Sequence, residues 1–180
     1  MAAKLSAIQA DISSLALEAI VNAANEPLIM GGGVDGAIRR KAGPQMETEI
    51  RRIGRCPTGE AVITRGHALP AKYVIHTVAP IWSGDETRRG HNLQLLASCY
   101  RNSLALAREH QLSEIAFPCL GTGVYGWPGD LAASTAFGTV PDFVRAHGGI
   151  SHVIFCCFNR TDLDRYNALI TQGQRENRVD

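Results

Sequence analysis

The sequence contains two glycine-rich loops, and each lies between a strand-like segment and a helix-like segment. The first loop has three consecutive glycines at 31–33, between the apolar run 19–21 and residues 34–42, which have helical composition. The second loop spans residues 121–126 and follows the apolar run 115–117. Alternation of strands and helices predicts parallel strands covered by helices, and hence an α/β fold.

Both loops are suited to bind an anion. A glycine loop that leads into a helix exposes backbone N–H groups at the helix N-terminus, where the partial positive charge favours phosphate. Both loops also match the spacing G-x-G-x-x-G, at Gly31, Gly33 and Gly36 and again at Gly121, Gly123 and Gly126. One copy of this spacing is a weak signal. Two copies in one chain predict a clamp for a diphosphate.

Two other interpretations of the glycines are open. They could be turn residues without a ligand. A dinucleotide-binding unit would instead use one such loop with an acidic residue about 20 positions later. Glu60 and Asp142 do not fit that position, because Glu60 opens a predicted strand and Asp142 lies in a predicted helix. Asn25 and Asp35, which flank the first loop, favour the diphosphate interpretation.

The length and charge of the chain set limits on its organisation and partners. With 180 residues, we expect a single domain, 1–180, whose polar tail begins at about residue 172. The formal net charge of +1 provides no extended basic field for nucleic acid or a membrane surface. Nucleic acid is therefore not the expected partner, and no membrane association is expected. Any bound anion must be held locally.

Cysteine and histidine are scattered along the sequence. The five cysteines form no Cys-x-x-Cys pair and the six histidines no His-x-x-x-His pair. This pattern predicts reduced, mostly buried thiols, and we expect no metal and no cofactor. Asp11 and Glu18 lie where a signal peptide would need an apolar core, and no long uncharged apolar stretch follows. We therefore expect a cytoplasmic protein.

Further segments complete the alternating pattern. Hydrophobic periodicity predicts more strands at residues 5–12, 59–65, 72–79, 114–118 and 152–158, and helices at residues 44–55, around 93–107 and at 128–147. Pro141 predicts either a kink or a new start in the helix 128–147. Thr161 and Asp164 predict a capping box for a last helix. His76, inside a strand, is interpreted as a hydrogen-bonded core histidine. The predicted architecture is a three-layer α/β/α sandwich, with the ligand at the carboxyl ends of the strands.

Three short motifs together resemble the macro domain, specifically its MacroD-type branch. They are Asn22-Ala-Ala-Asn25, the run Gly31-Gly-Gly-Val-Asp35-Gly, and Gly121-Thr-Gly-Val-Tyr125-Gly126. Their order and spacing extend the resemblance over nearly the whole chain. It implies a central mixed, mostly parallel sheet. The implied partners are ADP-ribose, O-acetyl-ADP-ribose and ADP-ribosylated proteins.

The resemblance also implies which residues bind the ligand. Asp11 and Ile12 would read the adenine, and Phe158 would pack on it. The diphosphate would lie between the two loops, at Gly31, Gly32, Gly33, Val34, Gly121, Thr122, Gly123, Val124, Tyr125 and Gly126. Asn25 would hydrogen-bond the distal ribose, and Tyr125 would close over it. Trp127 could close over the ligand too, or could be a packing residue.

The implied catalytic residues are Asn25 and Asp35. In hydrolytic members of the branch, the matching Asp orients or deprotonates a water that attacks the ester carbonyl or the anomeric carbon. The implied reactions are hydrolysis of O-acetyl-ADP-ribose to ADP-ribose and acetate, and removal of mono-ADP-ribose from Asp and Glu side chains.

The chain departs from the pattern of this branch at a few positions. Arg39 stands where the branch has His, on the same helix face as Asp35. It could pair with Asp35 and weaken that residue as a base, or point to solvent. The departure leaves open a non-catalytic ADP-ribose reader. Gly121 replaces a common Ser, and Ala10 a common Gly. RNA binding by basic clusters that include Arg39 is a distant third hypothesis, which the low net charge disfavours.

Overall fold

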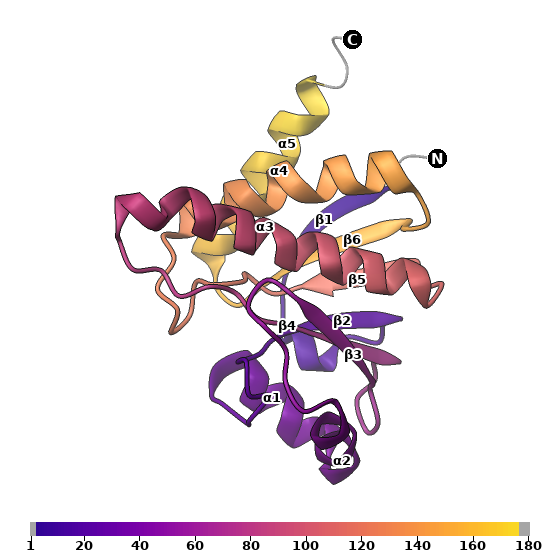
Figure 1. The fold of residues 1–180 in the computed structure, drawn as a ribbon. Coiled ribbons are helices and arrows are strands. Elements are labelled where there is room, and N and C mark those ends of the chain that lie inside the picture. Colours follow the sequence, from indigo (N-terminus) through magenta and orange to yellow (C-terminus); the bar gives the residue numbers. More distant parts are fainter. Residues whose placement is uncertain (1–2, 177–180) are drawn as a thin grey trace.

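The computed structural model describes residues 3–176, which contain one mixed sheet of six strands (Figure 1). The strand order is β1-β6-β5-β2-β4-β3. Neighbouring strands are parallel except β3 and β4, which are antiparallel. The strands are β1 (Lys4–Gln9), β2 (Ala19–Ala23), β3 (Ala61–Arg65), β4 (Tyr73–Thr77), β5 (Glu114–Phe117) and β6 (His152–Cys157).

Helices cover both faces of this sheet. A short 3-10 turn, η1 (Ile12–Ser14), follows β1, and the helices are α1 (Gly33–Ala42), α2 (Pro44–Ile53), α3 (Glu86–Glu109), α4 (Gly129–His147) and α5 (Arg160–Glu176). Helices α1 and α2 lie against one face, and α3, α4 and α5 against the other (Figure 1). The predicted three-layer α/β/α sandwich with a mixed, mostly parallel sheet is confirmed.

Alternation of side chains along the strands separates the two halves of the core. In β2, Ala19 and Val21 belong to the core beneath α3 and α4, whereas Ile20 belongs to the core beneath α1 and α2. The predicted apolar stripe of α3 faces the sheet, with Leu96 and Tyr100 fully buried. The five cysteines are free thiols, and all but Cys119 are buried, as expected for a reduced core.

The first strand is shorter than the sequence predicts. It ends at Gln9, not at Ile12, because the next residues turn out of the sheet. Asp11 is the N-cap of η1, and its side chain accepts a hydrogen bond from the Ser13 N–H at 2.9 Å. The expected short turn at the serines is therefore present, and it incorporates Ile12.

The start of the last helix was predicted wrongly. Helix α5 begins at Arg160, and the cap is Asn159, whose side-chain oxygen accepts from the Asp162 N–H at 2.8 Å. The pair Thr161 and Asp164 lies inside the helix instead of capping it. Helix α5 also continues to Glu176, beyond residue 172, where we expected the tail to begin.

Pro141 lies within α4, so the helix does not start again at this residue. The single helix Gly129–His147 thus runs past a residue that has no N–H to donate. In residues 3–176, no helix has the length and apolar character needed to cross a membrane.

Candidate functional site

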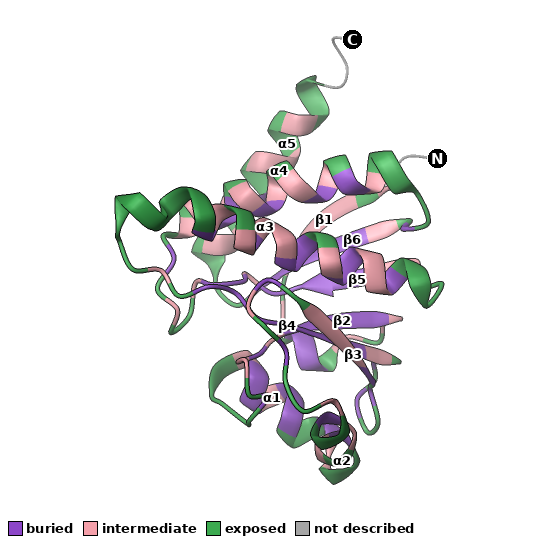
Figure 2. Cartoon of the chain, in the orientation of Figure 1, coloured by how far each residue is buried: buried purple, intermediate pink, exposed green. Residues whose placement is uncertain are grey.

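The predicted site residues gather where the parallel strands end. The first glycine loop follows β2 and the second follows β5, and these two strands are neighbours in the sheet. Both loops therefore open at one edge of the molecule. The large hydrophobic side chains that the described part of the chain exposes also follow strand ends: Ile29, Met30, Ile81, Val124 and Phe158. In Figure 2, the loop that precedes α1, which holds Ile29 and Met30, is coloured as exposed.

Asp35 fixes the conformation of the first loop. It lies in the first turn of α1 and is only 4% exposed. Its Oδ2 accepts a hydrogen bond from the Gly31 N–H at 2.6 Å. The Gly31 amide is thus directed at Asp35, which corrects the expectation that it points at a phosphate. The amides of Gly33 and Val34 belong to the first helical turn, which has no intrahelical acceptor for them.

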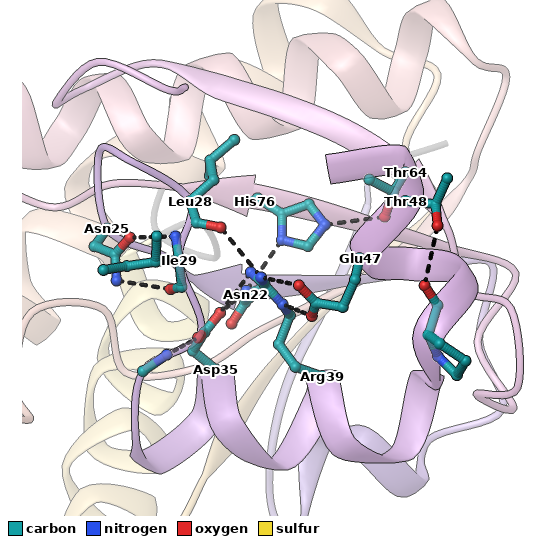
Figure 3. A network of polar contacts seen from close by, with 12 residues as sticks. Asn22, Asn25, Leu28, Ile29, Asp35, Arg39, Glu47, Thr48, Thr64 and His76 are labelled. Atoms are coloured by element: carbon teal, nitrogen blue, oxygen red, sulfur yellow. Dashed lines mark hydrogen bonds and ion pairs between the residues drawn. The ribbon is translucent and has the colours of Figure 1, made fainter. Parts of the chain in front are cut away.

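The side chains of Asn25 and Asp35 both lie close to Gly31. A Cβ atom at Gly31 would be 3.6 Å from Asp35 Oδ2 and 3.8 Å from Asn25 Nδ2. The Asn25 side chain also closes the turn that follows β2, because Nδ2 donates to the Ile29 oxygen at 2.9 Å and Oδ1 accepts from the Ile29 N–H at 3.0 Å (Figure 3). The two predicted catalytic residues are therefore brought together, and each also organises the loop.

Asn22 is a buried polar residue whose contact with Asp35 the sequence interpretation missed. It is fully buried in β2, and its Nδ2 donates to Asp35 Oδ1 at 2.7 Å. The same nitrogen lies 3.0 Å from His76 Nδ1, and His76 Nε2 lies 2.9 Å from Thr64 Oγ1 (Figure 3). An amide in an otherwise apolar strand was the available signal for this network.

His76 is the hydrogen-bonded core histidine that the sequence predicts. It is fully buried, and burial, together with the positive charge of Arg39, lowers its pKa to about 3. His76 is therefore neutral at physiological pH. Because the Asn22 amide nitrogen can only donate, His76 Nδ1 accepts and the ring proton is on Nε2.

Arg39 lies inside the protein, so the alternative that it points to solvent is wrong. It is 2% exposed, and its Nε and Nη2 donate to the two Glu47 oxygens at 2.5 and 2.7 Å. Nη2 also donates to the Leu28 oxygen at 3.1 Å, and Nη1 lies 3.7 Å from Asp35 Oδ1. The expected pair with Asp35 exists, but Glu47 is the closer partner.

The burial of Arg39 has two consequences. Hydrogen bonding to Arg39 lowers the pKa of Glu47 and keeps this carboxylate charged. In addition, Arg39 cannot join the exposed Arg40 and Lys41 in a continuous basic surface, which disfavours the RNA hypothesis at that cluster.

The buried Trp127 ring packs against the second loop. It is 3% exposed, and its Nε1 donates to the Pro80 oxygen at 2.7 Å, so it is the packing residue and not a lid. A Cβ atom at Gly121 would lie 2.6 Å from Trp127 Cδ1, and Gly121 has a φ of +86°. Both facts explain why this chain has glycine at that position.

Tyr125 belongs to the second loop and is half-buried. Its backbone oxygen accepts from the Trp82 N–H at 2.8 Å, which ties the second loop to the segment after β4. Burial raises the pKa of Tyr125, and the negative charges of Glu26 and Asp35 add to this effect. That Tyr125 closes over the ligand stays a prediction.

The residues expected to bind adenine meet at the ends of β1 and β6. The Ala10 N–H donates to the Cys157 oxygen at 3.1 Å, so Asp11 and Phe158 follow paired strands. Phe158 is 85% exposed, whereas Ile12 is buried. Hydrogen bonding from Ser13 lowers the pKa of Asp11, so its carboxylate is charged and can accept from an amino group.

Residues 3–176 hold no cluster of three or more His, Cys, Asp or Glu side chains placed to bind a metal ion. The arrangement provides free amides, an aromatic face and polar side chains at one edge. It is suited to an elongated, negatively charged ligand with an aromatic group at one end.

Comparison with known proteins agrees with this geometry. The family model described as "Macro domain" matches residues 21–136. The chain is 46% identical over 177 residues to an O-acetyl-ADP-ribose deacetylase of Escherichia fergusonii, covering 96% of this chain and 98% of that protein. It is 48% identical over 170 residues to the ADP-ribose glycohydrolase MACROD2 of Xenopus laevis, covering 94% of this chain and 40% of that protein.

A solved structure has the same fold. The Oceanobacillus iheyensis macrodomain with ADP superposes with a TM-score of 0.87 at 37% identity, covering 94% of this chain and 91% of that one. The family match, the relatives and the fold all agree: the chain belongs to the macro domain family, in its MacroD-type branch.

Proposed function

We propose that the chain binds ADP-ribose and hydrolyses its esters. The substrates would be O-acetyl-ADP-ribose, which yields ADP-ribose and acetate, and proteins that carry mono-ADP-ribose on Asp or Glu. The observation that carries the proposal is the position of Asn25 and Asp35 around Gly31, at the edge where both glycine loops open. The names of the deacetylase and glycohydrolase relatives support it.

The ligand would extend along the carboxyl ends of the strands. Adenine would stack on the exposed Phe158 ring, with its amino group donating to Asp11. The diphosphate would lie between the loops and take hydrogen bonds from first-turn amides such as that of Val34. The distal ribose would then reach Asn25, on the β2 side of the site.

The buried position of Asp35 suggests how it contributes. Its two oxygens already accept from Asn22 and Gly31, at 2.7 and 2.6 Å. The carboxylate would therefore hold the loop that positions the attacking water, and a phosphate oxygen of the substrate would take the proton from that water. The water oxygen would add to the acyl carbon, and the bond from that carbon to the ribose oxygen would break. The phosphate would return the proton to the ribose oxygen, which would leave as a hydroxyl.

The test is incubation of the purified protein with O-acetyl-ADP-ribose, with acetate and ADP-ribose measured over time. Asp35→Ala should lower turnover by roughly a hundredfold or more, the scale expected when the loop that positions the attacking water is displaced. ADP-ribose should still bind, because the second loop and Phe158 are unchanged. Asp142→Ala, which removes an exposed carboxylate on α4, is the matched control and should turn over normally. Unchanged turnover in Asp35→Ala would refute the role assigned to Asp35, and a wild-type protein that releases no acetate would refute the proposed function.

The alternative function is a non-catalytic reader of ADP-ribose. It is favoured by the same observation that makes Asp35 a poor base, namely that both of its oxygens are already engaged. A reader would release heat on titration with ADP-ribose and leave O-acetyl-ADP-ribose intact during long incubation. Time-dependent release of acetate excludes it.

A further inference from the structure

A chain of buried hydrogen bonds connects the far edge of the sheet to the first loop. It begins at Thr64 on β3, passes through His76 on β4 and Asn22 on β2, and ends at Asp35 on α1 (Figure 3). All four side chains are buried. Because Asp35 also holds the Gly31 amide at 2.6 Å, the chain reaches the backbone of the loop itself.

Chemistry fixes the direction of each hydrogen bond in this chain. A carboxylate only accepts, so the Asn22 amide must present its nitrogen to Asp35. The same nitrogen lies 3.0 Å from His76 Nδ1, which must therefore accept. If the Asn22 amide were rotated, its oxygen would face the Asp35 carboxylate. An acceptor at His76 Nδ1 therefore favours the one orientation of Asn22 that can hold Asp35.

The groups around His76 keep it in this state. The charged side chains that face the network are Asp35, which Asn22 separates from the ring, and Arg39, whose positive charge disfavours a histidinium. Thr64 Oγ1 lies 2.9 Å from Nε2 and accepts a hydrogen bond from the Nε2–H.

We propose that His76 is a positioning residue for the hydrolysis proposed above, acting through Asn22 and Asp35 on the Gly31 loop. It touches neither the ligand nor the water. The inference rests on the proposed function for its kinetic effect, but its structural effect on the Gly31 amide can be measured without substrate. Since the loop positions the water, small displacements should lower kcat more than they weaken ADP-ribose binding.

Two substitutions at His76 separate positioning from packing. In His76→Asn, the side-chain oxygen can take the place of Nδ1 and accept from Asn22. In His76→Gln, the longer side chain carries its amide to the place of Nε2 and leaves Asn22 without that acceptor. We expect His76→Gln to lower kcat roughly tenfold, with ADP-ribose affinity within about threefold of wild type, and His76→Asn to restore most of kcat.

Nuclear magnetic resonance provides the readout that packing alone would not change. The Gly31 amide proton, bonded to a carboxylate, should resonate downfield in the wild type, move upfield in His76→Gln and return in His76→Asn. In the wild type, the His76 ring should be protonated on Nε2 and not on Nδ1. This last measurement is made on the wild type, so it does not depend on whether a variant folds.

The outcomes distinguish the two proposals. A proton on Nδ1 of His76 in the wild type would overturn the positioning role alone. So would a His76→Gln variant of an active wild type in which the Gly31 amide resonance does not move. Equal loss of kcat in both variants would also overturn it. A wild-type protein that releases no acetate would overturn the proposed function, whatever the position of the Gly31 resonance.

Discussion

Lowering the pH from 7 to 5 should destabilise the fold through His76. Its pKa is lowered to about 3 in the folded protein, from an ordinary value of 6.5. Between these values the unfolded chain binds a proton that the folded chain rejects, so stability rises with pH. The contribution is fully present above pH 6.5 and is lost as the pH falls toward 3.

The size of the effect follows from linkage. At pH 5 the folded histidine is still neutral and the unfolded one is almost fully protonated. Integrating from pH 7 to pH 5 gives a loss of about 2 kcal/mol in the free energy of unfolding. The size of this loss is set by the ordinary histidine pKa of 6.5, because the pKa of about 3 in the folded protein lies well below pH 5.

Urea denaturation of the wild type and of His76→Asn at the two pH values measures the effect. The variant lacks the ring but keeps the other titrating groups, including His152, whose lowered pKa acts in the same direction. We expect the wild type to lose about 2 kcal/mol more than the variant. Parallel losses in the two proteins, or a wild-type His76 ring that protonates above pH 5, would refute the reasoning.

Three further changes test other contacts. Gly36→Ala should weaken ADP-ribose binding in calorimetry, because the added Cβ would lie 2.7 Å from the backbone oxygen of Gly31 and displace the first loop. Glu47→Gln should lower the free energy of unfolding in urea by about 1 to 3 kcal/mol, because the buried Arg39 loses its carboxylate. Phe158→Ala should cost about 1 to 3 kcal/mol of ADP-ribose binding free energy by calorimetry, from lost stacking. Its melting temperature should not change, because the ring is 85% exposed.

Matched controls accompany these changes. Gly138→Ala, on α4 and outside both loops, has no atom within 4 Å of the added Cβ and should bind normally, so equal weakening would argue against displacement of the loop. Glu86→Gln removes only an exposed pair with Arg89 and should change stability by less than about 1 kcal/mol. A Phe158→Ala protein with wild-type affinity would exclude stacking on that ring.

The sequence predicted the architecture because its signals are local. The apolar runs, the glycine loops after β2 and β5 and the stripe of α3 each fall within one segment, and their alternation limits the topology. The meeting of the two loops follows from the same rule, since parallel strands end at one edge. Local propensity failed at the start of α5, where Asn159 supplied the cap in place of the predicted capping box.

The polar interior of the site could not be predicted in the same way. The network joins Asn22 on β2 to Thr64 and His76 on the consecutive strands β3 and β4, and no spacing rule relates the three residues. Arg39 belongs to a run of basic residues that suggests a solvated surface. It is buried because Glu47, on the following helix, lies where it can pair with the guanidinium.

The pairing of Arg39 and Glu47 makes these two positions interdependent in evolution. A buried guanidinium that loses its acid, or an acid that loses its guanidinium, leaves a charge without compensation. Lineages should therefore replace the two residues together or keep both. In homologues with histidine at the position of Arg39, we expect the position of Glu47 to tolerate apolar residues, and an alignment would reveal this as covariation.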